Sequence, residues 1–523
     1  MNTPHSFLSP SPVATLVNSF SLPFANAVAA ARTCYSAKGI VDAGETAKWS
    51  RRDDLARSIY QAGHHTVYQH AHFQFALSNV SRQFVWSFLH SHPYYNSEQV
   101  SQRYVEVQPG TVIVPKLEGN PLSIYQKTVE AQFAAYHQLG ETLLEPVRAA
   151  YFDRFKNRAG QAEDKKIQED IKKRCMEAAR YALPIGAFTQ LYHTINGITL
   201  LRYHRLCRQY DAPTEQAAVA GLMVEELLKQ APEYRIILED PLPLEETPEH
   251  RFFHKAGHVP DDRAFREFAH EFDVDLDGRI SLLIDHKVDN EGLLANAVRE
   301  VLGVPRTEID DDTAIAMALD PAANPLLGET LNLTTLDKIT RALAHPSYTF
   351  RKKISHTADS QNQRHRATPA SRPCLRAYLS NNPDYITPAI IASHPKSLEI
   401  YRKTMERSWE GIRQLRKAGV PDEFVCYLLP NAVSLRFTES ADLLNLRHKC
   451  AMRLCLNAQE EIWRASREEV QQIQQINPRI ARYLLPPCGL RSLAHASPPC
   501  PEGGRFCGVP AWKTGLNEIT RLI

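Results

Sequence analysis

Hydrophobic and polar positions along the chain follow two periods, and the longer period dominates. Apolar residues recur every three or four positions over residues 118–151, 163–181 and 398–418, which predicts long helices. Residues 72–77 (HFQFAL) alternate one by one instead, which predicts a strand with one buried face. Helical patterns outnumber strand patterns, so the sequence predicts an α+β fold.

A weak internal repeat divides the chain. The tetrapeptide ANAV occurs at residues 25–28 and again at 295–298, each time after a strand-like segment and at the start of a helical pattern. The two strand-like segments are residues 14–17 and 280–284. Recurrence at a fixed order of elements is typical of a duplicated domain, so we predict two copies.

Later features recur in the same order. Each half has a histidine-containing turn, then a polar segment rich in His, Ser and Arg, then a Leu-Pro pair that we expect to open a helix. The turns are residues 63–66 and 344–346, and the pairs are Leu183-Pro184 and Leu429-Pro430. Residues 232–272 are rich in proline and acidic residues, which is typical of a connector. We therefore predict a first copy over 1–231, the connector over 232–272, a second copy over 273–485 and a Cys- and Pro-rich tail over 486–523.

Composition narrows the class of protein. The 523 residues exceed what one hydrophobic core serves, and 43% hydrophobic with 23% charged residues is typical of a globular protein. No stretch approaches the roughly 20 apolar residues of a membrane-spanning helix, and the N-terminus does not resemble a secretion signal. We expect a cytoplasmic protein without membrane contact, whose ten cysteines are mostly reduced. The net charge of +2 gives no support for a nucleic-acid partner.

Residues 90–104 (HSHPYYNSEQVSQRY) form the first chemically suggestive segment. Arginine offers a planar fork of donors to phosphate, and serine hydroxyls add short hydrogen bonds. Ser101 and Arg103 are therefore candidate anion ligands. The alternative is an ordinary polar loop.

Residues 360–373 (SQNQRHRATPASRP) form the second segment, in which Arg364, His365 and Arg366 are adjacent. A basic triplet alone favours a solvated surface or a nucleic-acid contact.

Together the two segments resemble the flavin-dependent thymidylate synthases, whose signature is RHR followed by a serine-rich loop that ends in SxRY. The first copy has residues 63–70 (GHHTVYQH), Ser81-Arg82 and 101–104 (SQRY) in the family's order, but His90-Ser91-His92 replaces RHR. Its loop before Ser101 is about one residue longer than in the family. The second copy keeps QxxRHR at 361–366, but the shortened loop 367–373 lacks SxRY.

The same division appears downstream. The first copy has the family's upstream arginine and asparagine as Arg180 and Asn196, but Cys207 stands at the catalytic-arginine position. The second copy has Cys426 in place of the upstream arginine and Asp442 in place of the asparagine. It keeps the catalytic arginine as Arg453, which is followed by AQEEI at 458–462. Each copy keeps what the other has lost. Cys207 follows an apolar helical pattern, so we interpret it as a buried structural cysteine.

In the family, neighbouring subunits share each nucleotide site. The resemblance therefore implies that the copies form a pseudo-dimer with one composite site and an inactive reciprocal site. It implies Arg453 as the catalytic residue, because a fixed guanidinium stabilises negative charge that develops on a uracil ring. The implied dUMP ligands are Ser101, Arg103, Arg180, Gln361 and Arg364. The implied FAD contacts are His64, Thr66, Asn196, Arg364, His365 and Arg366.

The implied reaction is the reductive methylation of dUMP to dTMP, with methylenetetrahydrofolate as carbon donor and FAD, reduced by NADPH, as hydride source. Family members are homotetramers, so a tandem chain is expected to form a homodimer.

The C-terminal tail carries a separate pattern of potential metal ligands: Cys488, His495, Cys500 and Cys507. Four such residues could hold a structural zinc ion, although the paired CxxC spacing is absent. The alternative is reduced thiols in a tail that packs on the second copy.

Three classes of function remain open: the synthase, a non-catalytic nucleotide-binding relative, and a nucleic-acid-binding protein. The second is supported by the broken signatures. The third would use Arg351-Lys352-Lys353 and Arg364-His365-Arg366. A related enzyme that transfers another one-carbon group also fits the sequence.

Overall fold

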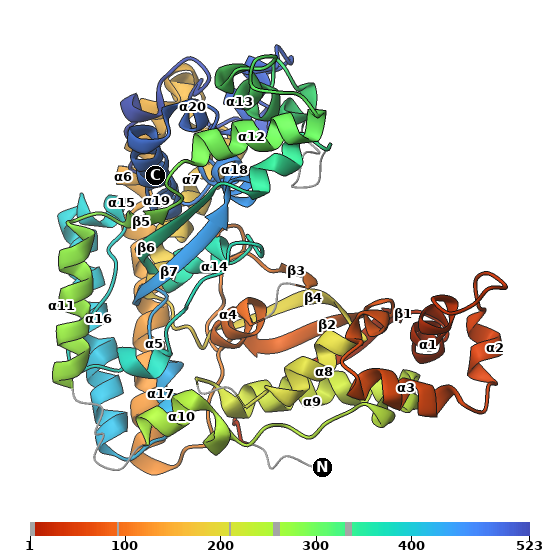
Figure 1. Cartoon of the computed structure of the whole chain (residues 1–523). Helices are drawn as coiled ribbons and strands as arrows, with labels where there is room; N and C mark the ends of the chain where they lie inside the picture. The colour runs from red at the N-terminus through yellow and green to blue at the C-terminus, as the bar shows by residue number, and fades with distance from the viewer. Residues whose placement is uncertain (1–5, 92–93, 209–210, 255–261, 330–336) are drawn as a thin grey trace.

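The computed structural model describes residues 6–91, 94–208, 211–254, 262–329 and 337–523. It contains two small antiparallel sheets, each covered by helices (Figure 1). The first sheet has the order β1-β2-β4-β3 and the second β5-β6-β7. The strands are β1 Val13–Ser19, β2 His72–Ser81, β3 Tyr95–Gln99, β4 Phe188–Asn196, β5 Ser281–His286, β6 Ser347–Ser355 and β7 Ser434–Asp442.

Helices make up most of the regular structure, which confirms the predicted α+β class. Those of the first half are α1 Pro23–Thr33, α2 Ala43–Ala47, α3 Arg52–Gln61, α4 Arg82–His90, α5 Gly119–Thr142, α6 Leu144–Arg154, α7 Lys165–Ala179, α8 Gly197–Arg205 and α9 Pro213–Gln230. Those of the second half are α12 Asn290–Leu302, α13 Asp311–Leu319, α14 His356–Asn362, α15 Ala389–Ala392, α16 Pro395–Lys417, α17 Asp422–Cys426, α18 Leu443–Arg453, α19 Glu460–Ile476, α20 Pro478–Ala481 and α21 Pro487–Leu493.

Most predicted elements are confirmed. Residues 72–77 lie in β2, and the two repeated strand-like segments correspond to β1 and β5. The pattern over 118–151 is divided into α5 and α6 at Leu143, which is fully buried. The segment predicted as a connector, residues 232–272, contains α10 Pro248–Phe253 and most of α11 Asp262–Leu276, which extends into the predicted second copy.

The Leu-Pro pairs do not open helices, so that prediction is wrong. They face each other across the two copies: Pro184 forms an isolated antiparallel bridge with Pro430. The Ile185 N–H donates to the Leu429 carbonyl at 2.8 Å, and the Asn431 N–H donates to the Leu183 carbonyl at 2.7 Å. A residue that precedes proline favours extended backbone, so each pair leads into a strand, β4 or β7.

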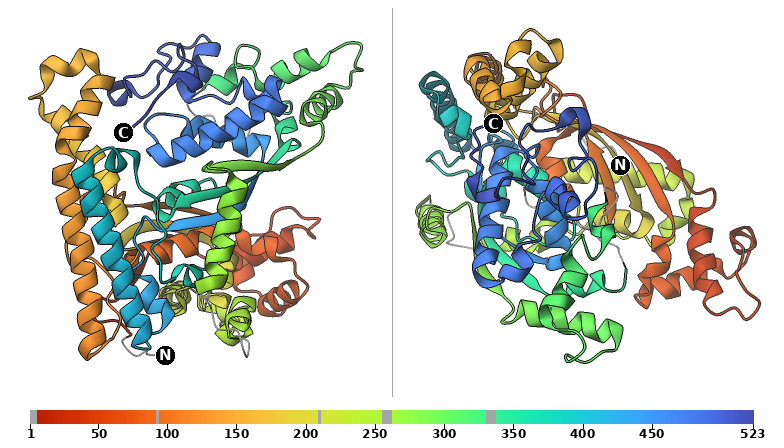
Figure 2. Two further views of the ribbon diagram at one scale, coloured as in Figure 1. Left: turned by 90° about the vertical axis from the view of Figure 1, so that its left-hand side faces the viewer. Right: turned by 90° about the horizontal axis from the view of Figure 1, so that it is seen from above.

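The two copies share one hydrophobic core. Helices α5 and α16 lie side by side along it (Figures 1 and 2), and Tyr125 and Trp409 are fully buried within it. The helices approach closely because residue 411 is glycine: a Cβ there would lie 2.2 Å from Thr128 Oγ1. Two further cores lie under the separate sheets.

Reciprocal hydrogen bonds relate the copies as a pseudo-dimer. Ser81 caps α4, and Glu215 accepts from its N–H at 2.7 Å and its hydroxyl at 2.6 Å. Glu215 also accepts from the Tyr427 hydroxyl of the other copy at 2.8 Å. The second half repeats this arrangement with Ser355, Glu461 and Tyr181. Both contacts cross between the copies, so each copy completes a buried network of its partner.

Within the described ranges, none of the helices combines the length and the apolar character that a membrane span requires.

Candidate active site

Arg453 lies at the end of α18, whose first turn is capped by Asp442. Its Nη2 donates to the Gln361 carbonyl at 2.7 Å, while its buried Nε has no hydrogen-bond partner among the described residues. Burial, together with nearby Arg103 and Arg364, lowers the pKa of Arg453 to about 10. The guanidinium is therefore charged at neutral pH and has donor capacity left for a ligand.

Gln459 joins the predicted halves of the site. Its Oε1 accepts from Arg180 Nη2 of the first copy at 2.8 Å and from Gln361 Nε2 of the second copy at 2.6 Å. Gln459 is 2% exposed and also donates to the Tyr181 hydroxyl. The structure thus brings Arg180 and Gln361 to one oxygen atom. Sequence reasoning gave Gln459 no role, although the AQEEI segment was its signal.

Arg103 contacts the second copy directly. Its Nη2 donates to the Asn457 carbonyl at 2.6 Å, and its Nε pairs with Glu177. The Ser101 hydroxyl accepts from the Arg103 N–H at 3.2 Å, which forms a short turn. Burial acts to raise the pKa of Glu177, but Arg103 and Arg180 outweigh it and hold the pKa below its usual range. An ionised carboxylate therefore lies where Arg103 would meet an anion.

The RHR segment lies against the first copy. Arg364 pairs with Glu98 on β3 at 2.7 Å, and the Arg366 guanidinium lies 5.3 Å from the centroid of the Tyr95 ring. His365 is buried, which lowers its pKa well below its usual range, with a further contribution from Arg453. Its ring is therefore neutral and lies 5.7 Å from that of His448 on α18.

The other predicted flavin contacts lie on the first sheet. Asn196 ends β4, next to the residue that pairs with Tyr95, and its side chain caps α8 by accepting from Thr199. His64 and Thr66 are exposed in the segment that precedes β2. No hydrogen bond or ring contact joins these two to the RHR segment in the part of the chain that the structure describes.

A buried charge network supports the second copy's half of the site. Lys352 pairs with Glu439 and Glu469 at 2.6 Å each, and Lys449 pairs with the same two carboxylates. All four side chains are at most 1% exposed. Asn362, just before the RHR segment, donates to Glu439 at 2.5 Å. The network therefore connects the end of α14 to α18, which carries His448 and Arg453.

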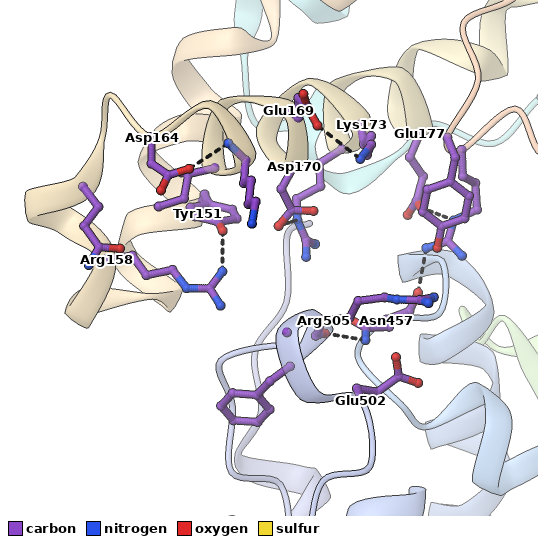
Figure 3. A pocket seen from close by; sticks show the side chains of 18 residues that line it. Tyr151, Arg158, Asp164, Glu169, Asp170, Lys173, Glu177, Asn457, Glu502 and Arg505 are labelled. Atoms are coloured by element: carbon purple, nitrogen blue, oxygen red, sulfur yellow. Dashed lines mark hydrogen bonds and ion pairs between the residues drawn. The ribbon is translucent and has the colours of Figure 1, made fainter.

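Two neighbouring cavities, of about 580 and 660 Å³, open at this junction. They share four lining residues: Arg103, Asn457, Glu502 and Arg505. The first, shown in Figure 3, has a nearly even mixture of basic and acidic side chains. The second also contains Arg453 and His448, and five arginines outnumber two glutamates on its wall. Anions are favoured in the second cavity by this imbalance.

A third cavity, of about 440 Å³, occupies the reciprocal position. Ser87 and His90 line this cavity. Their spacing from the helix cap Ser81 equals the spacing of Gln361 and Arg364 from the equivalent helix cap, Ser355. Arg372 lines it too, but both its Nε and Nη2 bond to Asp359, at 2.7 and 2.9 Å.

Cys207, at the catalytic-arginine position, is buried, and burial raises its pKa to about 11. The thiol is therefore protonated and inert. His92, the last residue of the segment that replaces RHR in the first copy, lies outside the described residues.

The structure gives the predicted zinc site no support. The described residues, which include all four predicted ligands, contain no group of three or more His, Cys, Asp or Glu side chains placed to hold a metal ion. Cys507 instead packs with Leu456 and Trp463, and Cys488 lies in α21. The tail therefore packs through an apolar cluster that includes Cys507.

The side chains of the basic triplet 351–353 are already paired within the protein and are not free to contact a nucleic acid. Lys352 belongs to the buried network, Lys353 pairs with Asp273 at 2.7 Å and Arg351 pairs with Asp275. The nucleic-acid hypothesis loses this contact surface.

Known proteins resemble both halves of the chain. A sequence model of the family described as "thymidylate synthase complementing protein" matches residues 15–233 and 282–479. The flavin-dependent thymidylate synthase of Geobacter sulfurreducens is 29% identical over 183 residues, 34% of this chain and 73% of that protein. That of Clostridium tetani is 28% identical over 213 residues, 39% of this chain and 77% of that protein.

Among solved structures, a UMP/dUMP methylase, PolB from Streptomyces cacaoi, aligns with 17% identity and a TM-score of 0.28, over 43% of this chain and 93% of that one. The assignment rests on the sequence match, which spans most of the chain in two tandem segments. The chain therefore belongs to the family of the flavin-dependent thymidylate synthases, as a tandem duplicate of the family domain.

Proposed function

We propose that the chain catalyses the FAD-dependent reductive methylation of dUMP to dTMP, with methylenetetrahydrofolate as carbon donor and NADPH as reductant. The reaction takes place at one composite site per chain. The observation that carries this proposal is the shared hydrogen-bond acceptor: Gln459 Oε1 bonds to both Arg180 and Gln361, which come from different copies.

The first copy supplies the phosphate ligands. Arg103 and Ser101 adjoin each other in one turn, and Arg180 lies behind them beside Glu177. Several converging donors hold a nucleotide in one orientation, which lowers the entropic cost of reaching the transition state. Glu177 must release Arg103, at least in part, when the phosphate binds.

The second copy supplies Arg453, which acts on the uracil ring. Methylation at C5 requires that negative charge develop on N3 and the neighbouring oxygens. A buried guanidinium that stays charged at neutral pH stabilises this charge without reorganising. The Gln361 carbonyl fixes the direction of its free Nε.

The residues around the RHR segment fit a flavin. The buried His365 Nε2 and Tyr95 hydroxyl have no hydrogen-bond partner among the described residues, so polar atoms of a ligand can satisfy them. Arg364 and Arg366 add charge at the same edge of β3. Bound flavin supplies the hydride, and the chain's residues orient it and exclude water.

The test is an absorbance spectrum of the purified protein, followed by addition of NADPH, dUMP and methylenetetrahydrofolate at low oxygen. A flavin spectrum with dTMP formation, lost in Arg453→Ala but kept in Arg482→Ala, is the expected result. Arg482 is an exposed arginine that stacks on Tyr483 away from both cavities at the junction. Absence of flavin and of dUMP affinity would exclude the proposal.

A second candidate is a flavin- and nucleotide-binding relative without turnover. It is favoured by the pairing of Arg103 with Glu177, which competes with a phosphate. In the same experiment it predicts bound flavin and dUMP affinity without dTMP.

We further propose that the chain forms a homodimer, which would reproduce the four family domains of a tetramer. Sedimentation at several concentrations tests this: a mass twice that of the 59.2 kDa chain is expected.

A further inference from the structure

The C-terminal tail, residues 486–523, lies beyond the last residue that the family's sequence model matches. It nevertheless packs against both copies. Cys507 joins Leu456 and Trp463 of the second copy, and Gly508 adjoins Phe155 of the first so closely that a Cβ there would lie 2.4 Å from the ring. The tail is therefore fixed at the junction where the composite site opens.

A chain of contacts links the tail to Arg103. The Asn457 carbonyl accepts from Arg103, and the Asn457 side chain donates to the Arg505 carbonyl at 2.8 Å (Figure 3). One residue of the second copy thus holds both a predicted phosphate ligand and a tail arginine. Arg103 and Arg505 line both cavities at the junction.

The tail also increases the positive charge of the cavity that contains Arg453. Arg491 and Arg505 are two of its five arginines. Arg491 is held by the Gly328 carbonyl at 3.2 Å and the Pro498 carbonyl at 3.1 Å. In contrast, the Arg505 side chain is exposed and has no hydrogen-bond or ion-pair partner among the described residues.

We propose that Arg505 of the tail is a further ligand of the nucleotide's phosphate, opposite Arg103 in the composite site. The inference deepens the proposed function and depends on it for the identity of the nucleotide. A phosphate between the two guanidinium groups would replace Glu177 as the partner of Arg103 and give Arg505 the partner it lacks. Arg491 contributes to the field of the cavity, and its two carbonyl contacts position the tail.

The test compares the binding of dUMP, deoxyuridine and inorganic phosphate to the full chain by calorimetry. In Arg505→Ala the dissociation constant of dUMP should rise about tenfold, which is the usual cost of losing one charge-assisted hydrogen bond. That of phosphate should rise similarly, whereas that of deoxyuridine should stay unchanged. Arg505→Lys should recover part of the loss. The matched control Arg482→Ala removes one exposed arginine elsewhere and should behave as wild type.

Two results would overturn the inference: equal dUMP affinity in Arg505→Ala and wild type, or an equal loss for dUMP and deoxyuridine, which would show a general disturbance of the cavity. If the wild type forms dTMP and Arg505→Ala binds dUMP as tightly as the wild type, the proposed function stands and the tail's role is rejected. A wild type that binds phosphate through Arg505 but binds no flavin rejects the proposed function and retains the tail's role.

Discussion

The composite site and its reciprocal cavity occupy equivalent places in the two halves of the pseudo-dimer, yet they differ in charge. The cavity at the proposed composite site has five arginines on its wall, including Arg453. The half with the reciprocal cavity has the buried Cys207 at the catalytic-arginine position, and Asp359 pairs with Arg372 on the cavity's wall.

Different segments close the two cavities. The C-terminal tail lines the composite site with Arg491 and Arg505. The connector lines the reciprocal cavity with Thr247, Pro248 and Glu249. The tail adds positive charge, whereas the connector adds an acidic residue and a ring. The two segments therefore give the two cavities walls of different charge.

The buried cores beside the two cavities also differ in charge. In the second copy, four charged residues form the buried network. The equivalent positions in the first copy, found from strand register and from spacing after the helix caps, are Leu77, His193, Tyr203 and Met223. His193 is buried, which lowers its pKa to about 3, and its ring centroid lies 4.8 Å from that of Phe88. The second copy therefore has a buried four-residue charge network at positions where the first copy has Leu, Tyr, Met and a neutral His.

The largest expected effect comes from breaking this network. Lys352→Leu inserts the first copy's residue but leaves two buried carboxylates with one lysine, so the free energy of unfolding should fall by about 3–5 kcal/mol. Urea unfolding measures it.

The matched variant replaces all four network residues with their first-copy counterparts, Leu, His, Tyr and Met. Its stability should return to within about 2 kcal/mol of wild type, because no unpaired charge remains buried. Flavin affinity should nevertheless fall, since Asn362 loses its acceptor. If Lys352→Leu is as stable as the wild type, the network does not stabilise the fold.

The next effect distinguishes the two equivalent catalytic positions. Arg453→Ala should lower kcat about a hundredfold or more, because it removes a fixed charge that stabilises the transition state. Cys207→Ala should leave kcat unchanged. Steady-state kinetics at saturating dUMP measures both, and similar losses in the two variants would mean that both cavities are active.

A smaller effect is expected at the junction between the copies. Gln459→Ala leaves Arg180 and Gln361 without their common acceptor, so the dissociation constant of dUMP should rise about tenfold. The equivalent residue of the first copy is Pro213, which has no such side chain. Unchanged dUMP affinity, measured by calorimetry, would contradict the role of Gln459 as the link between the half-sites.

The smallest effect concerns a feature that the two copies share. Burial raises the pKa of Glu215 to about 7. The folded chain therefore binds this proton more tightly than the unfolded chain, and the group's contribution to stability is lost as the pH rises from about 5 to 7. Glu215→Gln should reduce the slope of unfolding free energy against pH by about 1 kcal/mol per unit in that window.

The control for this slope is Asp310→Asn. Asp310 caps α13, and its hydrogen bonds to Thr313 hold its pKa below the usual value, so it does not titrate above pH 5. Identical slopes in Glu215→Gln and wild type would show that Glu215 is ionised in the folded state throughout the window.

The sequence predicted those parts of the fold that local patterning specifies. The alternation over 72–77 gave β2, and the helical periodicity gave α7 and α16. The Leu-Pro pairs were misinterpreted because their backbone groups bond across the copies, a contact that no local pattern shows. The domain boundaries stay predictions.

The site was predictable in its residues and not in its connections. Complementary losses, at Cys207 in the first copy and Cys426 in the second, predicted that the copies share a site, and the structure joins Arg180 and Gln361 through Gln459. Gln459 was missed because its role exists only where two copies meet. The four predicted zinc ligands gain no support, because the described residues contain no group of three or more His, Cys, Asp or Glu side chains placed to hold a metal ion.

The most direct test of the account is the number of dUMP molecules bound per chain by the purified, flavin-loaded protein, measured by calorimetric titration. We expect one dUMP per 523-residue chain, because Arg103 and Arg453, a proposed phosphate ligand and the proposed catalytic arginine, both line one of the two cavities and neither lines the other. Two dUMP molecules per chain would contradict it, since the reciprocal cavity would then be a functional site.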